Sequence, residues 1–416
     1  MKIRRFLFCF LIALIISVGI FPLVHAAQDV TCRRFFEGNN LVIVSLDGHY
    51  FATSDPISGT IRLLGKNGNP VWGYQTGEKI SSLTISDDGG IIAAGSDNGK
   101  ILGFDKNGDL IWKFDDMGCF PKVMITGDGQ QGYIVNGDSP STPYPYTLHY
   151  FARNGIVLWE TREPGISSAS ITANGKYLVV GTKVGRNSEV ILYAENGTNL
   201  WRYPAPDGIE FVAISQDGNT IAAVHSYRLI VLDNKGTILS EVIPKYHPTS
   251  IAISPDGSQI VTGSTFGGQS FNRSGSQLWQ AYDEGINSIA ISMDGQTIIS
   301  GSQKNVSYFN ENGTLMWGVP VDRAVASISI SADGDTILAG SYNGTVYLLN
   351  RNGNAKRLSL ETLSVRPLPS VITTPEKNAG SFVKSVDSAQ ASPLMASIAL
   401  TALGVCAIVL NYRRRR

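Results

Sequence analysis

The chain has 416 residues, a formal net charge of zero and only 16% charged residues. Binding to nucleic acid needs a basic face, so this charge balance excludes nucleic acid as a partner. The 44 glycines, together with many aromatic residues and no long amphipathic helical pattern, indicate an all-β protein.

The N-terminus has the pattern of an export signal. Three basic residues precede a long apolar run, and small residues lead up to Ala26, where a signal peptidase would cut. We therefore expect residues 1–26 to be a signal peptide and 27–39 to be a short N-terminal segment. A retained N-terminal membrane anchor is the alternative, and in both cases the rest of the chain faces outward.

Residues 40–359 contain one motif repeated eight times. Each copy holds four strands in about 40 residues, with one hairpin turn after the first strand and another after the third. Asp-Gly and Asn-Gly supply the positive φ of type I′ turns, so each pair predicts a hairpin. The first turns are Asp47-Gly48, Asp88-Gly89, Asp128-Gly129, Asn174-Gly175, Asp217-Gly218, Asp256-Gly257, Asp294-Gly295 and Asp333-Gly334.

A tryptophan follows the glycine of the second turn at a constant spacing in six of the copies. Ser240 and Arg357 take the equivalent place in copies five and eight. A large ring at one position per repeat fills the wedge between stacked sheets, so we predict a structural role for these residues. They are Trp72, Trp112, Trp159, Trp201, Trp279 and Trp317.

Four strands per copy predict a β-propeller of about eight four-stranded blades, because a closed ring leaves no exposed sheet edge between blades. Seven blades would result if the first or last copy were incomplete. The segment from Arg33 to Glu37 could then supply an extra closing strand.

The sequence after the repeats predicts a stalk and a membrane anchor. Residues 360–393 are rich in Ser, Thr and Pro, which is typical of an extended stalk. Residues 394–412 are uncharged and mostly apolar, as in a transmembrane helix, and the arginines of 413–416 predict a basic cytoplasmic tail. We therefore expect a single-pass membrane protein with its ectodomain at the cell surface.

The repeats resemble two known kinds of propeller. The stretch Asp105-Lys106-Asn107-Gly108-Asp109-Leu110-Ile111-Trp112 resembles the tryptophan-containing repeats of quinoprotein-like (PQQ-like) propellers. The strand Ile251-Ala252-Ile253-Ser254-Pro255-Asp256-Gly257 resembles the opening of a WD40-like blade. The resemblance covers about residues 40–359 and implies a propeller on a prokaryotic, membrane-anchored surface protein.

Two departures from these families bear on function. The quinone-dependent dehydrogenases use adjacent cysteines and acidic metal ligands, and this chain has no adjacent cysteine pair, so the cofactor-free propellers are the closer match. The Trp-Asp pairs of strict WD40 repeats are absent from the sequence, and a Gly-His pair occurs once, at Gly48-His49, instead of once per copy.

The sequence contains none of the common catalytic motifs. It has no His-Glu-x-x-His pair, no Gly-x-Ser-x-Gly elbow, no phosphate loop and no Cys-x-x-Cys. We therefore expect no enzyme activity, no cofactor and no metal. The alternatives are a diverged quinone- or metal-dependent oxidoreductase and an envelope assembly scaffold.

The connections at the two ends of the blades differ in uniformity, and we expect the variable end to bind a partner. The largest insertion, Ser139 to Tyr146, offers Tyr144 and Tyr146 as contacts. Acidic residues also recur in the links between blades, where they could favour a cation or a basic peptide near the central channel. These residues are Glu78, Asp116, Glu163, Asp207, Glu284 and Asp322.

These features predict a binding, adhesion or scaffold module whose partner is an extracellular protein or glycan. Outside the cell, Cys32 and Cys119 could form a disulfide, because Cys9 and Cys406 lie in the two apolar ends. Glycosylation is chemically allowed at five sequons, headed by Asn196, Asn272, Asn305, Asn312 and Asn343.

Overall fold

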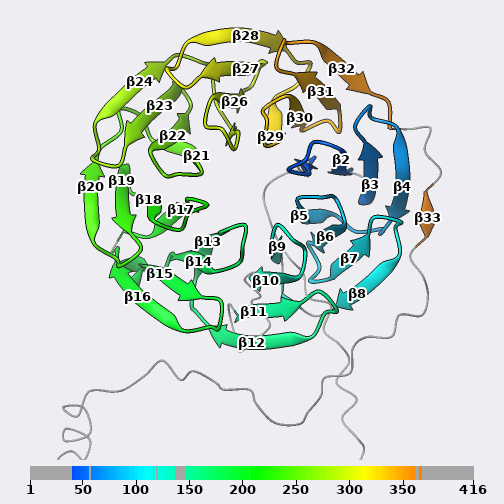
Figure 1. The fold of residues 1–416 in the computed structure, drawn as a ribbon, viewed down its shortest axis with the longest axis horizontal. Helices are drawn as coiled ribbons and strands as arrows, with labels where there is room; N and C mark the ends of the chain where they lie inside the picture. Colours follow the sequence, from blue (N-terminus) through cyan, green and yellow to red (C-terminus); the bar gives the residue numbers. More distant parts are fainter. Residues whose placement is uncertain are drawn as a thin grey trace, which may run out of the picture. The chain divides into compact units, whose positions relative to one another are not determined.

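The computed structural model describes residues 40–55, 58–115, 117–118, 120–135, 147–205, 207–360 and 365–367. In these ranges, eight antiparallel sheets form a closed ring (Figure 1), which confirms the predicted β-propeller with eight blades. The predicted signal peptide, the Arg33 to Glu37 segment and the transmembrane helix lie outside the described residues. Among the described residues, no helix is long and apolar enough to cross a bilayer.

Every blade runs from an inner strand to an outer strand in chain order. Blades 1 to 4 contain β1 (Val42–Val44), β2 (Tyr50–Ser54), β3 (Thr60–Gly65), β4 (Pro70–Gln75), β5 (Ile80–Ile85), β6 (Ile91–Ser96), β7 (Ile101–Asp105), β8 (Leu110–Phe114), β9 (Lys122–Ile125), β10 (Gln131–Val135), β11 (Thr147–Ala152), β12 (Val157–Arg162), β13 (Ile166–Ile171), β14 (Tyr177–Thr182), β15 (Glu189–Ala194) and β16 (Asn199–Pro204). Blades 5 to 8 contain β17 (Ile209–Ile214), β18 (Thr220–His225), β19 (Arg228–Asp233), β20 (Ile238–Val242), β21 (Pro248–Ile253), β22 (Gln259–Ser264), β23 (Gly267–Asn272), β24 (Gln277–Ala281), β25 (Ser288–Ile291), β26 (Thr297–Gly301), β27 (Asn305–Asn310), β28 (Leu315–Pro320), β29 (Val325–Ile330), β30 (Thr336–Ser341), β31 (Val346–Asn350) and β32 (Ala355–Leu358). A short 3₁₀ helix, η1 (Gly185–Asn187), lies between β14 and β15.

Because the strands are antiparallel, the connections lie at two opposite ends of each blade. The turns after the first and third strands lie at one end, which we call the turn face. The connections after the second strand and the links between blades lie at the other end, which we call the link face.

The hydrophobic core lies between neighbouring sheets. The facing sheets of blades 1 and 2, for example, bury Leu63 and Phe104 completely, and Ala52 and Ile92 lie in the same cluster. Successive side chains of a strand point to opposite faces of the sheet. One set therefore packs against the preceding blade and the other set against the following blade.

The Asp-Gly turns are hairpins, as predicted, but they are wider than type I′ turns. In blade 6, Gly257 N–H donates to Ser254 O (2.8 Å), so Pro255 and Asp256 are the central residues of a four-residue turn. Gly257 has a φ of 68°, while Asp256 does not take positive φ. The Ser254 hydroxyl stabilises this wider form, because it donates to Asp256 Oδ1 (2.7 Å) and accepts from Gln259 N–H (2.9 Å).

The same hydroxyl bond to an Asp or Asn side chain occurs in the first turn of all eight blades. The sequence pattern behind it is Ser/Thr-x-Asp/Asn-Gly. Each turn thus satisfies its own polar groups with its own side chains.

The tryptophan rings join each blade to the next. The Trp159 Nε1–H group donates to Glu195 O in the following blade (2.8 Å), and a Cβ atom on Gly197 would lie 2.8 Å from the ring. Equivalent bonds are made by Trp72, Trp201, Trp279 and Trp317. In blade 5, Ser240 makes the same bond to Arg273 O (2.9 Å).

Trp112 is the exception among the six rings. Its cross-strand neighbour is Gly103, and the indole lies over this glycine, so that a Cβ atom there would be 2.1 Å from Trp112. Trp112 is only 1% exposed, and its Nε1–H group has no hydrogen-bond partner. The glycine makes room for the ring to fold onto its own blade.

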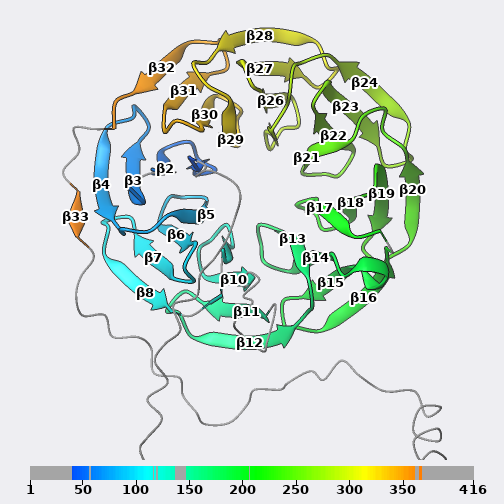
Figure 2. The ribbon, with the colours of Figure 1, turned by 180° about the vertical axis from the view of Figure 1, so that it is seen from behind.

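The ring closes without an exchange of strands between blades 8 and 1. Val42 N–H and Val44 N–H of β1 donate to the hydroxyls of Ser327 and Ser329 in β29, each at 3.0 Å. A fifth strand, β33 (Arg366–Pro367), pairs in parallel with β4 at the outer edge of blade 1, in both views (Figures 1 and 2). The start of the predicted stalk is therefore paired with the propeller, and proline is tolerated because β33 is an edge strand.

The first turns also form a hydrogen-bonded band around the inner rim of the turn face. Blade 8 is joined to blade 1 by Ala332 N–H and Leu46 O (2.8 Å), and blade 2 to blade 3 by Asp87 N–H and Gly127 O (2.8 Å). Similar bonds link seven of the eight pairs of neighbouring turns. Blade 6 does not donate to blade 7, because Pro255 stands at the donor position and has no N–H.

Candidate interaction surface

The predicted acidic residues of the links lie on the link face, and each one that the structure describes is paired with a cationic or ionisable side chain of its own blade. Asp322 lies 3.0 Å from Arg357, and Asp207 lies 3.8 Å from His225. Three more pairs join Glu78 to Lys100, Glu163 to Arg202, and Glu284 to Lys304. Asp116 lies outside the described residues.

Glu163 differs from the others because it is only 2% exposed. Its carboxylate accepts hydrogen bonds from Tyr193 and Arg202. Burial, followed by the charge of Glu163, raises the pKa of the Tyr193 hydroxyl well above its ordinary range. These contacts fasten the link to blade 4, and an additional role in attracting a cation or basic peptide stays a prediction.

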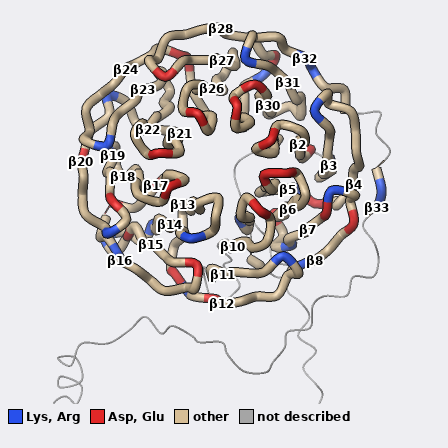
Figure 3. The backbone as a smooth tube through the Cα atoms, viewed as in Figure 1, with Lys and Arg blue, Asp and Glu red and all other residues tan. Residues whose placement is uncertain are grey.

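A second set of acids lies on the opposite face, at the first turns, and Figure 3 shows acidic residues at many of these inner turns. Their carboxylates are engaged in the turns themselves. Burial alone would raise the pKa of Asp256, but hydrogen bonds from Ser258 and Ser254 lower it below its ordinary value. The pKa values of Asp47, Asp88, Asp217, Asp294 and Asp333 are lowered as well.

Several other predicted site residues fall outside the described ranges. These are Tyr144, Tyr146, Cys32 and Cys119. The sequon residues Asn196 and Asn312 lie in turns on the turn face, and Asn272 ends β23 beside such a turn. Asn343 lies in a connection on the link face, and Asn305 begins β27.

A group of exposed, mostly aromatic side chains lies on the link face of blades 5 to 7 and was not predicted from the sequence. Tyr227 is 61% exposed, Phe266 60% and Tyr282 74%. We call the group the aromatic patch, and define it as Tyr227, Ile243, Tyr246, His247, Phe266 and Tyr282. An exposed cluster of large apolar side chains is typical of a protein interaction site.

Ring contacts connect the members of the aromatic patch. The centroids of Tyr246 and Phe266 are 5.0 Å apart, and those of Tyr227 and His247 are 4.4 Å apart. Lys245 Nζ lies 5.2 Å from the centroid of Tyr246 and 5.9 Å from that of Tyr282. The patch is therefore continuous across two successive links.

Buried groups hold the aromatic patch in place. Lys245 N–H donates to Oε1 of Gln269 (2.9 Å), whose side chain is 3% exposed and bonds in turn to Gln277 (3.0 Å). His247 Nε2 lies 3.1 Å from Glu210 Oε2 on the inner strand β17. A shallow hollow of about 280 Å³ lies within the patch, lined by Tyr246, Thr265, Phe266, Tyr282, Asp283 and Glu284.

Tyr227 is presented by a strained turn. Ser226 and Tyr227 have φ values of 36° and 70°, in the region that non-glycine residues seldom adopt. Residues held there cost of order 1–3 kcal/mol each and concentrate at functional sites. Only a small difference in the sequence indicates this strained turn. Blades 2 and 8 have Asp-Asn-Gly and Tyr-Asn-Gly in the same connection, whereas blade 5 has Ser-Tyr.

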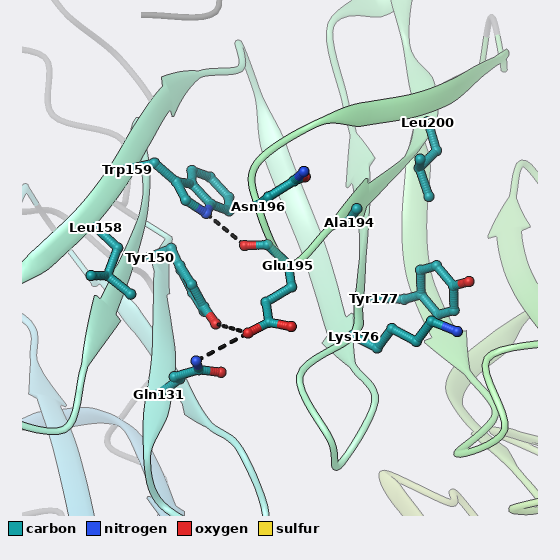
Figure 4. A pocket seen from close by; sticks show the side chains of 10 residues that line it. All are labelled: Gln131, Tyr150, Leu158, Trp159, Lys176, Tyr177, Ala194, Glu195, Asn196 and Leu200. Carbon is teal, nitrogen blue, oxygen red and sulfur yellow. Dashed lines mark hydrogen bonds between the residues drawn. The ribbon is translucent and has the colours of Figure 1, made fainter. Parts of the chain in front are cut away.

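The turn face carries a larger groove, of about 560 Å³, between blades 3 and 4 (Figure 4). Glu195 lies at its centre and accepts hydrogen bonds from Tyr150 Oη (3.2 Å) and Gln131 Nε2 (3.1 Å). The rings of Tyr150 and Trp159 stack with centroids 5.4 Å apart. Burial raises the pKa of Tyr150 far above its ordinary range, so its hydroxyl stays protonated and supports the groove as a donor.

Neither surface has the donor set of a quinone-dependent enzyme. Within the described ranges, no group of three or more His, Cys, Asp or Glu side chains could hold a metal ion. The described residues therefore do not form the metal-ligand group of the metal-assisted quinone site of the dehydrogenases.

Eight blades joined by repeated tryptophans define the class of this protein, which is a PQQ-like, WD40-like β-propeller. A family model described as outer membrane protein assembly factor BamB matches residues 57–239 and 146–373. The chain belongs to this family.

The solved structures support the same architecture. Sqt1 from Chaetomium thermophilum, bound to the N-terminus of the ribosomal protein L10, is 15% identical with a TM-score of 0.63, over 76% of this chain and 98% of that chain. A second crystal structure of Sqt1 from Chaetomium thermophilum is 14% identical with a TM-score of 0.63, over 78% of this chain and 99% of that chain. At these identities the likeness establishes the fold alone. None of the curated proteins matches the sequence significantly.

Proposed function

We propose that this protein is a non-catalytic interaction module of the cell envelope, which holds a partner protein on the aromatic patch. The observation that carries the proposal is the exposure of Tyr227, Phe266 and Tyr282 on one face of the propeller, where they contact His247, Tyr246 and Lys245 of a single link. Aromatic side chains are enriched in interfaces and supply most of their binding energy. The family description, an outer membrane protein assembly factor, supports a role in assembly.

The strained Ser226-Tyr227 turn supports the same conclusion. A glycine or asparagine at these positions would relieve the strain, yet the chain keeps a tyrosine that is 61% exposed and contributes little to the core. Contact with a partner explains why an exposed aromatic residue stands in this turn.

Site-specific cross-linking in the native envelope tests the proposal. A photo-reactive residue at position 266 or 282 should capture one partner protein. The same residue at 278 or 316 should not, because Leu278 (50% exposed) and Met316 (54% exposed) lie on the outer strands β24 and β28, away from the patch. Capture of an envelope assembly factor would support a scaffold, whereas capture of an extracellular protein would support adhesion.

Substitutions give a second, independent measurement. Phe266→Ser and Tyr282→Ser should each weaken binding of the captured partner by about 2 kcal/mol or more, the usual size of a hot spot. Both side chains are exposed, so the melting temperature should stay within about 1 °C of the parent, because exposed substitutions change stability by only about 0.5 kcal/mol. Equal losses with Leu278→Ser and Met316→Ser would contradict the assignment of this surface.

A further inference from the structure

Arg62 in β3 is a buried cation with two unpaired nitrogen atoms. The residue is 7% exposed, and its Nε and Nη1 atoms are buried with no hydrogen-bond partner. Its two cross-strand neighbours are Thr53 and Gly73, and the Thr53 hydroxyl is also buried without a partner. Leaving a buried charged group unpaired is costly, so such a group requires an explanation.

Packing of the blades does not explain an arginine at this position. Arg62 comes directly before Leu63, the residue of the third strand that pairs with Trp72 of the fourth strand. The residue in the same place can be identified in every blade from the pairing of its third and fourth strands. Four other blades place a buried aliphatic side chain there, namely Leu102, Ile191, Ile230 and Val346. The remaining three place a buried polar side chain there, namely His149, Gln269 and Ser307. Arg62 is the one guanidinium at this position among the eight blades, so packing alone does not require it.

Arg62 lines a cavity between blades 8 and 1, on the link face. The cavity has a volume of about 480 Å³ and is lined by Asp55, Arg62, Asn343, Thr345, Arg357 and Ser359, among others. Arg357 donates to Asp322 (3.0 Å) and to the hydroxyl of Thr345 (3.3 Å), which holds a second guanidinium at the cavity wall. This volume falls in the usual range for sites that hold a small molecule.

The charges in the cavity favour an anionic group. Burial lowers the pKa of Arg62 and the charge of Asp55 raises it, but an arginine remains protonated in either case. Asp55 Oδ1 already accepts a hydrogen bond from Ser58 N–H (3.0 Å). An oxyanion in the cavity would give one of these unpaired N–H groups of Arg62 an acceptor, and guanidinium groups bind carboxylate and phosphate through pairs of parallel N–H bonds.

We propose that the cavity between blades 8 and 1 binds the carboxylate or phosphate group of a ligand, with Arg62 as the principal donor. Arg357 contributes a second positive charge, and Asn343 and Thr345 line the same cavity. The volume exceeds that of a single ion, so the oxyanion is one group of a larger molecule. This site is separate from the aromatic patch and does not depend on the function proposed above.

Thermal unfolding of the full chain, with added phosphate, acetate or chloride at equal ionic strength, tests the proposal. Ligand that binds only the folded state raises the melting temperature in a saturable way. We expect phosphate or acetate, but not chloride, to do so, and the more effective anion identifies the oxyanion. Arg62→Met should weaken the effective anion at least tenfold, whereas Arg228→Met, an exposed arginine paired with Glu241, should leave its affinity unchanged.

Two further results make the test decisive. Without added anion, Arg62→Met should melt at or above the parent temperature, because an apolar residue replaces an unpaired buried charge. Asp55→Asn should strengthen anion binding, since it removes a negative charge and keeps an acceptor for Ser58. The proposal is overturned if neither anion raises the melting temperature beyond chloride, or if Arg62→Met lowers it without changing the anion effect.

Discussion

Trp112 and Gly103 offer a sharp test of how the blades pack. Trp112 is 1% exposed, and burying an indole removes about 150–250 Å² from water, worth about 4–6 kcal/mol at ~25 cal/mol per Å². The unpaired Nε1–H group offsets about 1–3 kcal/mol of this gain. The difference is about 1–5 kcal/mol, and the cavity left behind moves the cost toward the upper part of this interval. We therefore expect Trp112→Ala to lower the free energy of unfolding by about 3–5 kcal/mol, the usual range for a buried aromatic residue.

A double-mutant cycle separates this packing from a general loss of stability. A Cβ atom on Gly103 would lie 2.1 Å from the Trp112 ring, so Gly103→Ala should cost about 2 kcal/mol or more in the parent. In the Trp112→Ala background the ring is gone, and the same change should cost less than about 1 kcal/mol. Denaturant unfolding followed by circular dichroism measures all four proteins. If the two effects add, or if Trp112→Ala melts with the parent, the indole does not lie over Gly103 and the reasoning fails.

Two further predictions concern the turn face. Burial, followed by the charges of Asp88, Asp128 and Asp47, raises the pKa of Asp87. The ionised form of Asp87 therefore destabilises the folded state. This loss of stability develops as the pH rises through the pKa of Asp87 in the folded protein. Asp87→Asn should therefore melt above the parent at pH 7, and the difference should vanish in titrations near pH 3; a variant that melts below the parent at pH 7 would contradict the assignment. Gly257 has a φ of 68°, and a Cβ atom there would lie 2.3 Å from the Thr220 hydroxyl, so Gly257→Val should lower the melting temperature by several degrees, about 2 kcal/mol or more, without weakening a partner bound at the aromatic patch. Loss of binding without loss of stability would place the partner on the turn face instead.

The repeated pattern was sufficient to predict a ring of about eight blades, with seven as the alternative, and the structure has eight. The spacing of Asp-Gly turns and tryptophans depends only on local sequence, and each copy of the motif specifies the same four-stranded blade. The form of the turn was not predictable in the same way, because the Ser254 hydroxyl and the Asp256 carboxylate select a wider turn than an Asp-Gly pair alone would adopt. Likewise, Trp112 has the same motif as Trp72, and only its cross-strand neighbour, Gly103, distinguishes it.

The candidate sites depend on features that one sequence does not display. Tyr227 and Phe266 stand in ordinary connections of different blades, and they become a patch only because the links of blades 5 to 7 are neighbours in space. The significance of Arg62 requires the register of β3, since only alignment with the equivalent residues, such as Leu102 and Gln269, shows that no other blade has an arginine at this position. The acidic link residues were found from sequence, but their cationic partners were not.

Because of Pro255, the contact between blades 6 and 7 is weaker at the inner rim than the other contacts between neighbouring blades. Elsewhere around the inner rim, a widening gap between neighbouring blades must break a hydrogen bond between their first turns, whereas blades 6 and 7 can separate at this level without such a loss. Slow opening of the ring, as seen by hydrogen exchange, should therefore begin between β21 and β25. Phe266 and Tyr282 lie on the link face of the same two blades, at the end opposite Pro255. A partner bound to both side chains would therefore hold blades 6 and 7 together where the ring opens most easily.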